Sequence, residues 1–284
     1  AGDGARAVPQ FLEAARRAAA AGAPREAVAH HERALDIGVP DADLGAALEG
    51  IAQAYLAFDT THARRALQRA LEHSRAADDR RGQSRVLLLL SRVARVLAEP
   101  ATELVEEARK VVEDLGDTPE LARALITLGN DLAPAGRITQ LREIAEPALA
   151  MAERLNDKHL IAGALSLKAA ALVDDDPAEA VRLALRSRDL ALEAGVVMRA
   201  VMSYFTVVFA MERADASPAQ VVRMIDDGLA YARRHGVENN ALIPAAAYYH
   251  LNRGDWDSAL AAAQQITKSE YLDNALEIRG RIAE

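Results

Sequence analysis

The chain has 284 residues, no cysteine and a formal net charge of −8. The absence of cysteine excludes disulfides, thiolate nucleophiles and Cys-ligated metals, and the acidic balance argues against a nucleic-acid groove along the whole molecule. Apolar residues make up 51% of the composition but aromatic residues only 4%, which favours thin, closely packed helical layers over one thick core. No apolar run approaches the ~20 residues of a membrane span and no signal peptide opens the chain, so we expect a cytoplasmic protein without membrane contact.

The clearest unit in the sequence is the segment 120–155, which is typical of two amphipathic helices joined by a turn at Gly136. Thr118 and Pro119 precede it as an N-cap followed by proline at the first helical position. Leucines at spacings of 4, 3 and 4 form one apolar face of the first helix: Leu121, Leu125, Leu128 and Leu132. Gly129 leaves room for a second helix to approach closely. A hairpin of this kind cannot bury its apolar face alone, so we expect similar units to stack on it.

The same hairpin recurs along the chain. Predicted helix pairs cover 8–21 with 25–37, 41–57 with 62–76, 83–98 with 102–115, the unit 120–155, 159–173 with 177–194, 197–213 with 218–235, and 240–253 with 256–266. An apolar residue late in each second helix recurs every 36 to 41 residues, at Leu35, Leu71, Val111, Leu149, Leu190 and Leu229. This period favours stacked helix hairpins and does not fit a heptad coiled coil.

The predicted fold is therefore all-α: a right-handed α-solenoid of about seven antiparallel helix hairpins plus a C-terminal capping helix. We expect a single domain over 1–284, with repeats over 5–266 and the capping helix within 267–284. The missing initiating Met predicts an excised piece of a longer protein, in which residues 1–4 are a cloning remnant.

The pattern resembles the tetratricopeptide repeat. The fourth unit matches at Leu125, Leu128, Gly129, Leu132, Gly136 and Ile138, and the seventh at Ile243, Ala246, Ala247, His250, Gly254, Trp256 and Ala259. The resemblance implies that the first helix of each hairpin lines a concave face. The longer, irregular period and the phrase at 145–150 also look like the helical sensor arms of bacterial signal-transduction ATPases and large transcriptional activators. The sequence has neither their phosphate-binding loop nor a helix-turn-helix, so that likeness implies only the arm, or a stand-alone relative.

A row of polar residues is the main candidate binding site. Arg85, Arg92 and Arg95 follow Arg81 at spacings that put all four on one side of a helix. Adding 38 residues takes Arg85 to Arg123 and Arg92 to Asn130 on the next first helix, and Gln53 and Glu49 extend the row backward. One interpretation is an electropositive floor that clamps an acidic peptide or a chain terminus. The alternative is a solvated face whose arginines pair with acids on second helices.

Aromatic residues gather after residue 200. Register with the tetratricopeptide pattern predicts that Tyr248 points into the groove, whereas Trp256 packs between helices. The cluster fits an apolar pocket for a partner's anchor side chain or ordinary inter-helix core.

No residue pattern indicates catalysis. His30 and His31 are adjacent and point about 100° apart on a helix, so they cannot chelate one ion together, and we expect His31 to pack in the first hairpin. The run Asp174, Asp175 and Asp176 precedes Pro177 and is more typical of a helix N-cap than of a magnesium site. No Ser, His and acid set has a spacing typical of a triad. We expect no enzyme, no metal and no cofactor.

These observations predict an interaction or sensor module that holds a protein or peptide segment in its groove, as part of a bacterial regulatory or signalling protein, with no direct nucleic-acid contact. Two alternatives stay open. One is a small-molecule or signal-peptide sensor whose ligand changes the solenoid conformation, and the other is an enzyme with an α/α active site.

Overall fold

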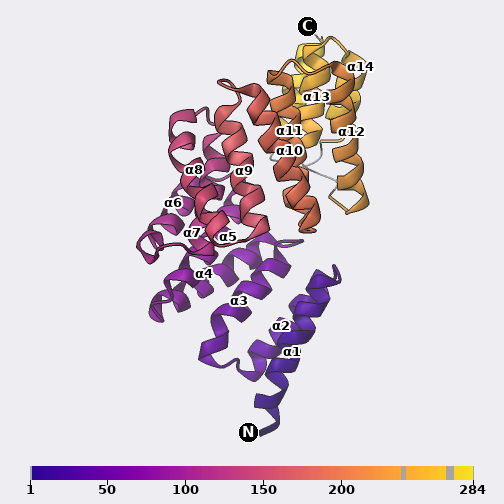
Figure 1. Ribbon diagram of the computed structural model, residues 1–284. Coiled ribbons are helices and arrows are strands. Elements are labelled where there is room, and N and C mark those ends of the chain that lie inside the picture. Colours follow the sequence, from indigo (N-terminus) through magenta and orange to yellow (C-terminus); the bar gives the residue numbers. More distant parts are fainter. Residues whose placement is uncertain (1, 238–240, 267–271, 284) are drawn as a thin grey trace. The chain divides into compact units, whose positions relative to one another are not determined.

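The computed structural model describes residues 2–237, 241–266 and 272–283, and over these residues the regular structure is entirely helical. The chain divides into two compact units, Ala1–Gly116 and Asp117–Glu284. The first unit contains α1 (Gly2–Ala20), α2 (Pro24–Ile37), α3 (Asp41–Tyr55), α4 (Thr60–Ala76), α5 (Arg80–Val96), α6 (Thr102–Lys110) and the 3-10 turn η1 (Glu113–Leu115) (Figure 1). The second contains α7 (Pro119–Leu132), α8 (Ile138–Arg154), α9 (Lys158–Leu172), α10 (Pro177–Glu193), α11 (Val197–Arg213), α12 (Pro218–Arg234), α13 (Leu242–Asn252), α14 (Trp256–Gln264) and α15 (Leu272–Ala283).

The predicted all-α fold and the order of its hairpins are confirmed, and most predicted boundaries agree within three residues. The two largest differences are at α1, which begins at Gly2 where the sequence predicts a start at 8, and at α6, which ends at Lys110 where the sequence predicts a helix to 115. The Arg80 Nε donates a hydrogen bond of 2.7 Å to the Val111 carbonyl oxygen, which occupies an acceptor that a longer helix would use. Of the predicted helical segments, residues 240, 267–271 and 284 lie outside the described part, and the single domain over 1–284 stays a prediction.

Helix starts follow the capping residues in the sequence. The Thr118 Oγ1 accepts a 3.2 Å hydrogen bond from the Leu121 N–H, as the N-cap prediction requires. The Asp176 Oδ1 likewise accepts from the Glu179 N–H at 3.0 Å, so the aspartate run ends in a helix cap. Ser217 opens α12 in a capping box.

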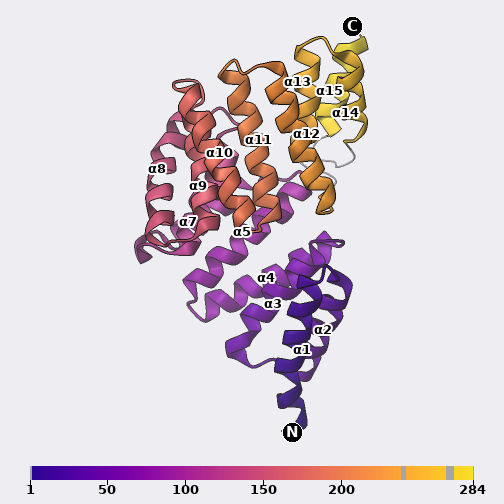
Figure 2. The ribbon, with the colours of Figure 1, turned by 45° about the vertical axis from the view of Figure 1, so that its right-hand side comes forward.

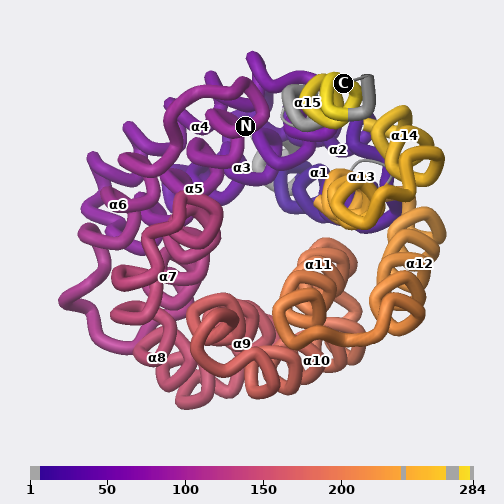
Figure 3. Tube along the Cα trace, turned by 90° about the horizontal axis from the view of Figure 1, so that it is seen from above, coloured from indigo at the N-terminus to yellow at the C-terminus, as the bar shows by residue number. Residues whose placement is uncertain are grey.

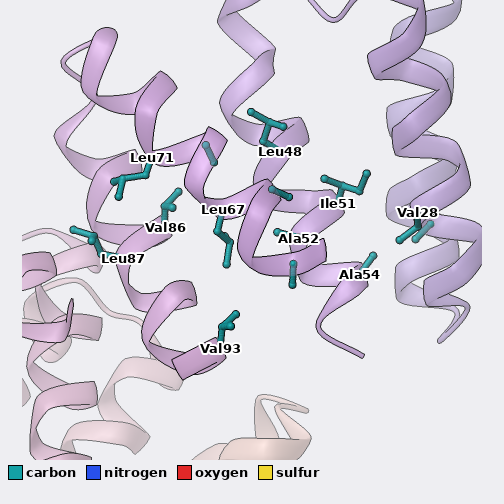
Figure 4. Close-up of a cluster of buried hydrophobic side chains, with 14 of the residues drawn as sticks. Val28, Leu48, Ile51, Ala52, Ala54, Leu67, Leu71, Val86, Leu87 and Val93 are labelled. Atoms are coloured by element: carbon teal, nitrogen blue, oxygen red, sulfur yellow. The ribbon is translucent and has the colours of Figure 1, made fainter. Parts of the chain in front are cut away.

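The first unit packs around a core of aliphatic side chains. Leu48 and Ile51 of α3, Leu67 of α4, and Val86 and Leu87 of α5 are all buried in one cluster (Figure 4). Helices α1 and α2 lie alongside each other, and α3 packs against α4 in the same antiparallel manner (Figure 2). The first and second helices of these hairpins therefore share one thin core, which small residues and leucines can fill.

In the second unit the hairpins form two layers along a curve. Helices α7, α9, α11 and α13 lie on the inner side, and α8, α10, α12 and α14 on the outer side (Figure 3). Consecutive inner helices from α7 to α13 contact one another directly. Gly129 of α7 permits this approach, because a Cβ built there would lie 2.6 Å from the Leu167 Cδ1 of α9.

Buried serines join three helices of this unit. The Ser187 Oγ on α10 lies 2.8 Å from the Ser166 Oγ of α9 and 2.9 Å from the Ser203 Oγ of α11. The Ser203 Oγ also donates a 3.0 Å hydrogen bond to the Arg199 carbonyl oxygen. Because buried hydroxyls are costly unless satisfied, this chain of hydrogen bonds fixes the start of α11 against α9 and α10.

Candidate binding surfaces

A hollow of about 1080 Å³ crosses the first helices of the first unit. Its walls come from α1, α3 and α5, with His31 of α2 also in the lining. Four of the predicted site residues lie together here: Glu49, Gln53, Arg85 and Arg92. The structure thus brings these four side chains together around one hollow.

Within the hollow, Arg85 and Glu49 form a two-point ion pair. The Arg85 Nε lies 3.2 Å from the Glu49 Oε2, and its Nη2 lies 3.1 Å from the Oε1. The Glu49 side chain is only 11% exposed, so its charge depends on this partner. The alternative interpretation placed the paired acids on second helices, but Glu49 belongs to α3, a first helix.

Arg92 differs from Arg85. It is exposed, lines the same hollow, and forms neither an ion pair nor a hydrogen bond with any residue in the described part of the chain. Gln53, on the neighbouring first helix α3, is also exposed. Both side chains can therefore reach a bound segment without breaking an existing contact.

Arg95 does not line this hollow. It is half-buried, and its Nη1 lies 3.4 Å from the Ser91 Oγ on the same helix. Its part in a binding site stays a prediction.

His31 is a lining residue that the site prediction missed, although its packing in the first hairpin is confirmed. The ring is buried, and its Nδ1 has no hydrogen-bond partner among the described residues. A Cβ built on Gly50 would lie 2.6 Å from the His31 Cε1, so the ring needs a glycine at this position. A glycine in the middle of a predicted helix was therefore the sequence signal for a side chain packed against it. Burial, together with the charges of Arg16 and His30, lowers the pKa of His31.

A smaller hollow of about 480 Å³ lies among α2, α3 and α4. There the Tyr55 hydroxyl donates a 2.6 Å hydrogen bond to the Glu32 Oε1. This bond to a carboxylate, with burial, raises the pKa of Tyr55 to about 12. The hollow includes Glu32, Asp36, Arg65 and Arg69, a mixture of charges that selects no one class of ligand.

The second unit carries the other two predicted groove residues from the row. Arg123 and Asn130 are exposed on α7, an inner helix. His159, near the start of α9, lies within electrostatic reach of Arg123 and of Arg199 on α11. Sequence reasoning missed His159 and Arg199, yet they follow Arg123 by 36 and a further 40 residues, within the repeat period. The register that links Glu49, Arg85 and Arg123 thus continues to both.

Both added residues carry buried atoms without partners. The Nδ1 of His159 and the Nε of Arg199 have no hydrogen-bond partner among the described residues. Burial lowers the pKa of Arg199, and burial together with the charge of Arg199 lowers the pKa of His159. The Arg199 guanidinium lies against Gly163, where a Cβ would be 3.3 Å from its Cζ.

Two of the C-terminal aromatics have contacts that bear on the predictions made for them. The Tyr248 hydroxyl donates a 2.5 Å hydrogen bond to the Glu277 Oε2 of α15, so this tyrosine links two helices. Trp256 is 50% exposed, and the prediction that it packs between helices is wrong. Its place at the first position of α14, directly after the N-cap Asp255, puts it at the hairpin turn.

No family model and no curated protein matches the chain. Among solved structures, the crystal structure of a Rap protein complexed with competence and sporulation factor is similar, with a TM-score of 0.63 and 12% identity over 99% of this chain and 95% of that one. The chain has the tetratricopeptide-like helical-repeat fold that its sequence predicts. BtubC (BKLC) from P. vanneervenii is also similar, with a TM-score of 0.51 and 12% identity over 83% of this chain and 93% of that one. The likeness to ATPase sensor arms stays a prediction.

Two further properties concern the described residues only. No group of three or more His, Cys, Asp or Glu side chains within them could hold a metal ion. None of their helices combines the length and hydrophobicity that a membrane crossing requires.

Proposed function

We propose that the protein is a non-enzymatic interaction module that holds an acidic peptide or protein segment in the hollow of its first unit. The observation that carries the proposal is Arg92, an exposed cation beside a hollow of about 1080 Å³ with no partner in the described part of the chain. The hollow is at the upper end of the usual range for small-molecule pockets, roughly 300–1,000 Å³. It also extends over three helices, which suits an extended segment.

The surrounding residues support a peptide rather than a metal or a reactive substrate. The exposed Gln53 offers both a donor and an acceptor to a backbone amide, and Leu12 and Leu89 add apolar contacts. The similar Rap protein was crystallised in complex with competence and sporulation factor. We extend that likeness to this chain as a role in a bacterial regulatory or signalling protein.

The test compares one charge reversal with a matched control. Arg92→Glu reverses the free cation, whereas Arg33→Glu makes the same change at an exposed position of α2 outside the hollow. The probe is a library of fluorescent acidic hexapeptides, read by fluorescence anisotropy, with lysine-rich hexapeptides as the opposite charge. We expect the wild type and Arg33→Glu to bind the acidic set, and Arg92→Glu to bind it at least about tenfold more weakly.

Equal melting temperatures for both variants would show that the loss is not unfolding. Equal peptide affinity in both variants, or no binding by the wild type, would contradict the proposal. If the wild type binds no peptide but a small molecule raises its melting temperature and changes its scattering radius, the sensor alternative holds instead.

A further inference from the structure

Three basic side chains come from successive inner helices of the second unit: Arg123 of α7, His159 of α9 and Arg199 of α11. All three stand at the same repeat position, since they follow one another by 36 and 40 residues. Helix α9 contacts both α7 and α11, so His159 lies on the helix between the other two, and both guanidinium charges act on its ring. This surface belongs to the second unit, and the inference does not depend on peptide capture in the hollow of the first unit.

The acid within reach is already engaged. Asp157 is the N-cap of α9, and its Oδ1 accepts hydrogen bonds from the backbone N–H groups of His159 at 2.9 Å and Leu160 at 3.1 Å. Within the described residues Arg199 has no ion pair, and its buried Nε has no acceptor. A buried donor without an acceptor costs about 1–3 kcal/mol, and more when it is charged. Because a guanidinium does not lose its proton in proteins, Arg199 cannot avoid this cost by becoming neutral.

The fold holds Arg199 in this position from two sides. Gly163 leaves a gap on α9 for the guanidinium, and a Cβ there would lie 3.3 Å from the Arg199 Cζ. The backbone of Arg199 is held by the Ser203 hydroxyl, which belongs to the buried serine chain. The fold therefore fixes the position of the unpaired guanidinium before an anion binds.

We propose that Arg199 and His159, with Arg123 beside them, form a binding site for a carboxylate group. A guanidinium presents parallel N–H donors that match the two oxygens of a carboxylate, and the free Nε belongs to one such pair. The His159 ring supplies another donor, and Arg123 adds long-range attraction. The carboxylate belongs either to a small organic acid or to the free C-terminus of a peptide.

The test follows the His159 ring by NMR while acetate or inorganic phosphate is added to the full chain. A bound anion stabilises the protonated ring, so we expect acetate to raise the pKa of His159. The charged groups that face this ring are Arg123, Arg199 and Asp157. Phosphate acting alone would overturn the assignment to a carboxylate, and no response to either anion would overturn the site.

Three variants localise the effect. Arg199→Lys keeps the charge but removes the paired donors, and should weaken acetate binding about tenfold. Arg123→Gln changes an exposed side chain, cannot disturb the core, and should weaken binding several-fold. Arg186→Lys on α10 is the matched control at an exposed position and should change nothing. Unaltered binding in both Arg199→Lys and Arg123→Gln would contradict the proposal.

The source of the carboxylate is read from two peptides of the same sequence, one with a free C-terminus and one amidated. A response to the free form alone assigns the site to a chain terminus. A response to acetate but to neither peptide assigns it to a small organic acid.

Discussion

The same repeat position carries acidic or basic residues in both units, but the two units differ in whether these residues are paired. In the first unit it is occupied by Glu13, Glu49 and Arg85, and the buried Glu49 is neutralised by Arg85. In the second unit it is occupied by Arg123, His159 and Arg199, with buried nitrogen atoms that have no partner among the described residues. In the first unit the paired residues at this position form a structural contact. In the second unit the unpaired nitrogen atoms at this position are a candidate site for a ligand. A basic row in sequence therefore does not by itself reveal which arginines bind.

The largest expected effect comes from breaking the pair in the first unit. Arg85→Met leaves the Glu49 carboxylate buried without its main partner, and we expect the free energy of unfolding to fall by about 2 kcal/mol. Urea denaturation followed by circular dichroism measures this change. Arg92→Met is the matched control on the same helix and should shift the free energy by less than about 0.5 kcal/mol.

Equal costs for Arg85→Met and Arg92→Met would mean that the ion pair contributes no stability, and the contrast between the two units would lose its basis.

Arg199→Met should act in the opposite direction. It replaces a half-buried cation, whose buried Nε has no partner among the described residues, by an apolar side chain of similar length, so we expect the second unit to become more stable by about 1 kcal/mol. Hydrogen exchange of the α9 and α11 amides assigns the gain to this unit, and Arg186→Met on α10 serves as the exposed control. A loss of stability in Arg199→Met would show that the arginine already contributes net stabilising interactions, which would remove the contrast.

Periodicity and capping residues were sufficient to predict the helices. Most helix boundaries depend on local signals, such as Thr118 before Pro119 or the glycine after a helix end, and these signals lie within a few residues of their effect. The charged row was also predictable as far as Arg123, because one register runs through the repeats. The same register also includes His159 and Arg199, whose spacing fits, but the sequence prediction did not include them.

The pairing state was harder to predict, because it depends on distances between side chains rather than on register. Nothing in the spacing distinguishes Arg85, whose acid lies 36 residues earlier, from Arg92, which has no partner in the described residues. The prediction for Trp256 was wrong for a similar reason. A repeat pattern assigns a residue to a position but does not give the contacts that it makes at a hairpin turn.

The smallest expected effect is on the pH dependence of stability, and it compares His31 of the first unit with His159 of the second. Burial lowers the pKa of both below the ordinary value of 6.5. The unfolded chain therefore binds more protons than the folded one just below that value, so stability is complete above pH 6.5 and falls as the pH drops toward the folded pKa values. Urea denaturation between pH 7.5 and 5.5 measures the slope, and His31→Gln and His159→Gln should each reduce it.

Acetate separates the two histidines in that experiment. If the carboxylate site exists, acetate raises the pKa of His159 and should reduce the slope in the wild type and in His31→Gln, but not in His159→Gln. Chloride at the same ionic strength controls for general screening. An equal effect of acetate in His159→Gln would show that the anion acts elsewhere, and the two units would then differ in pairing without differing in ligand binding.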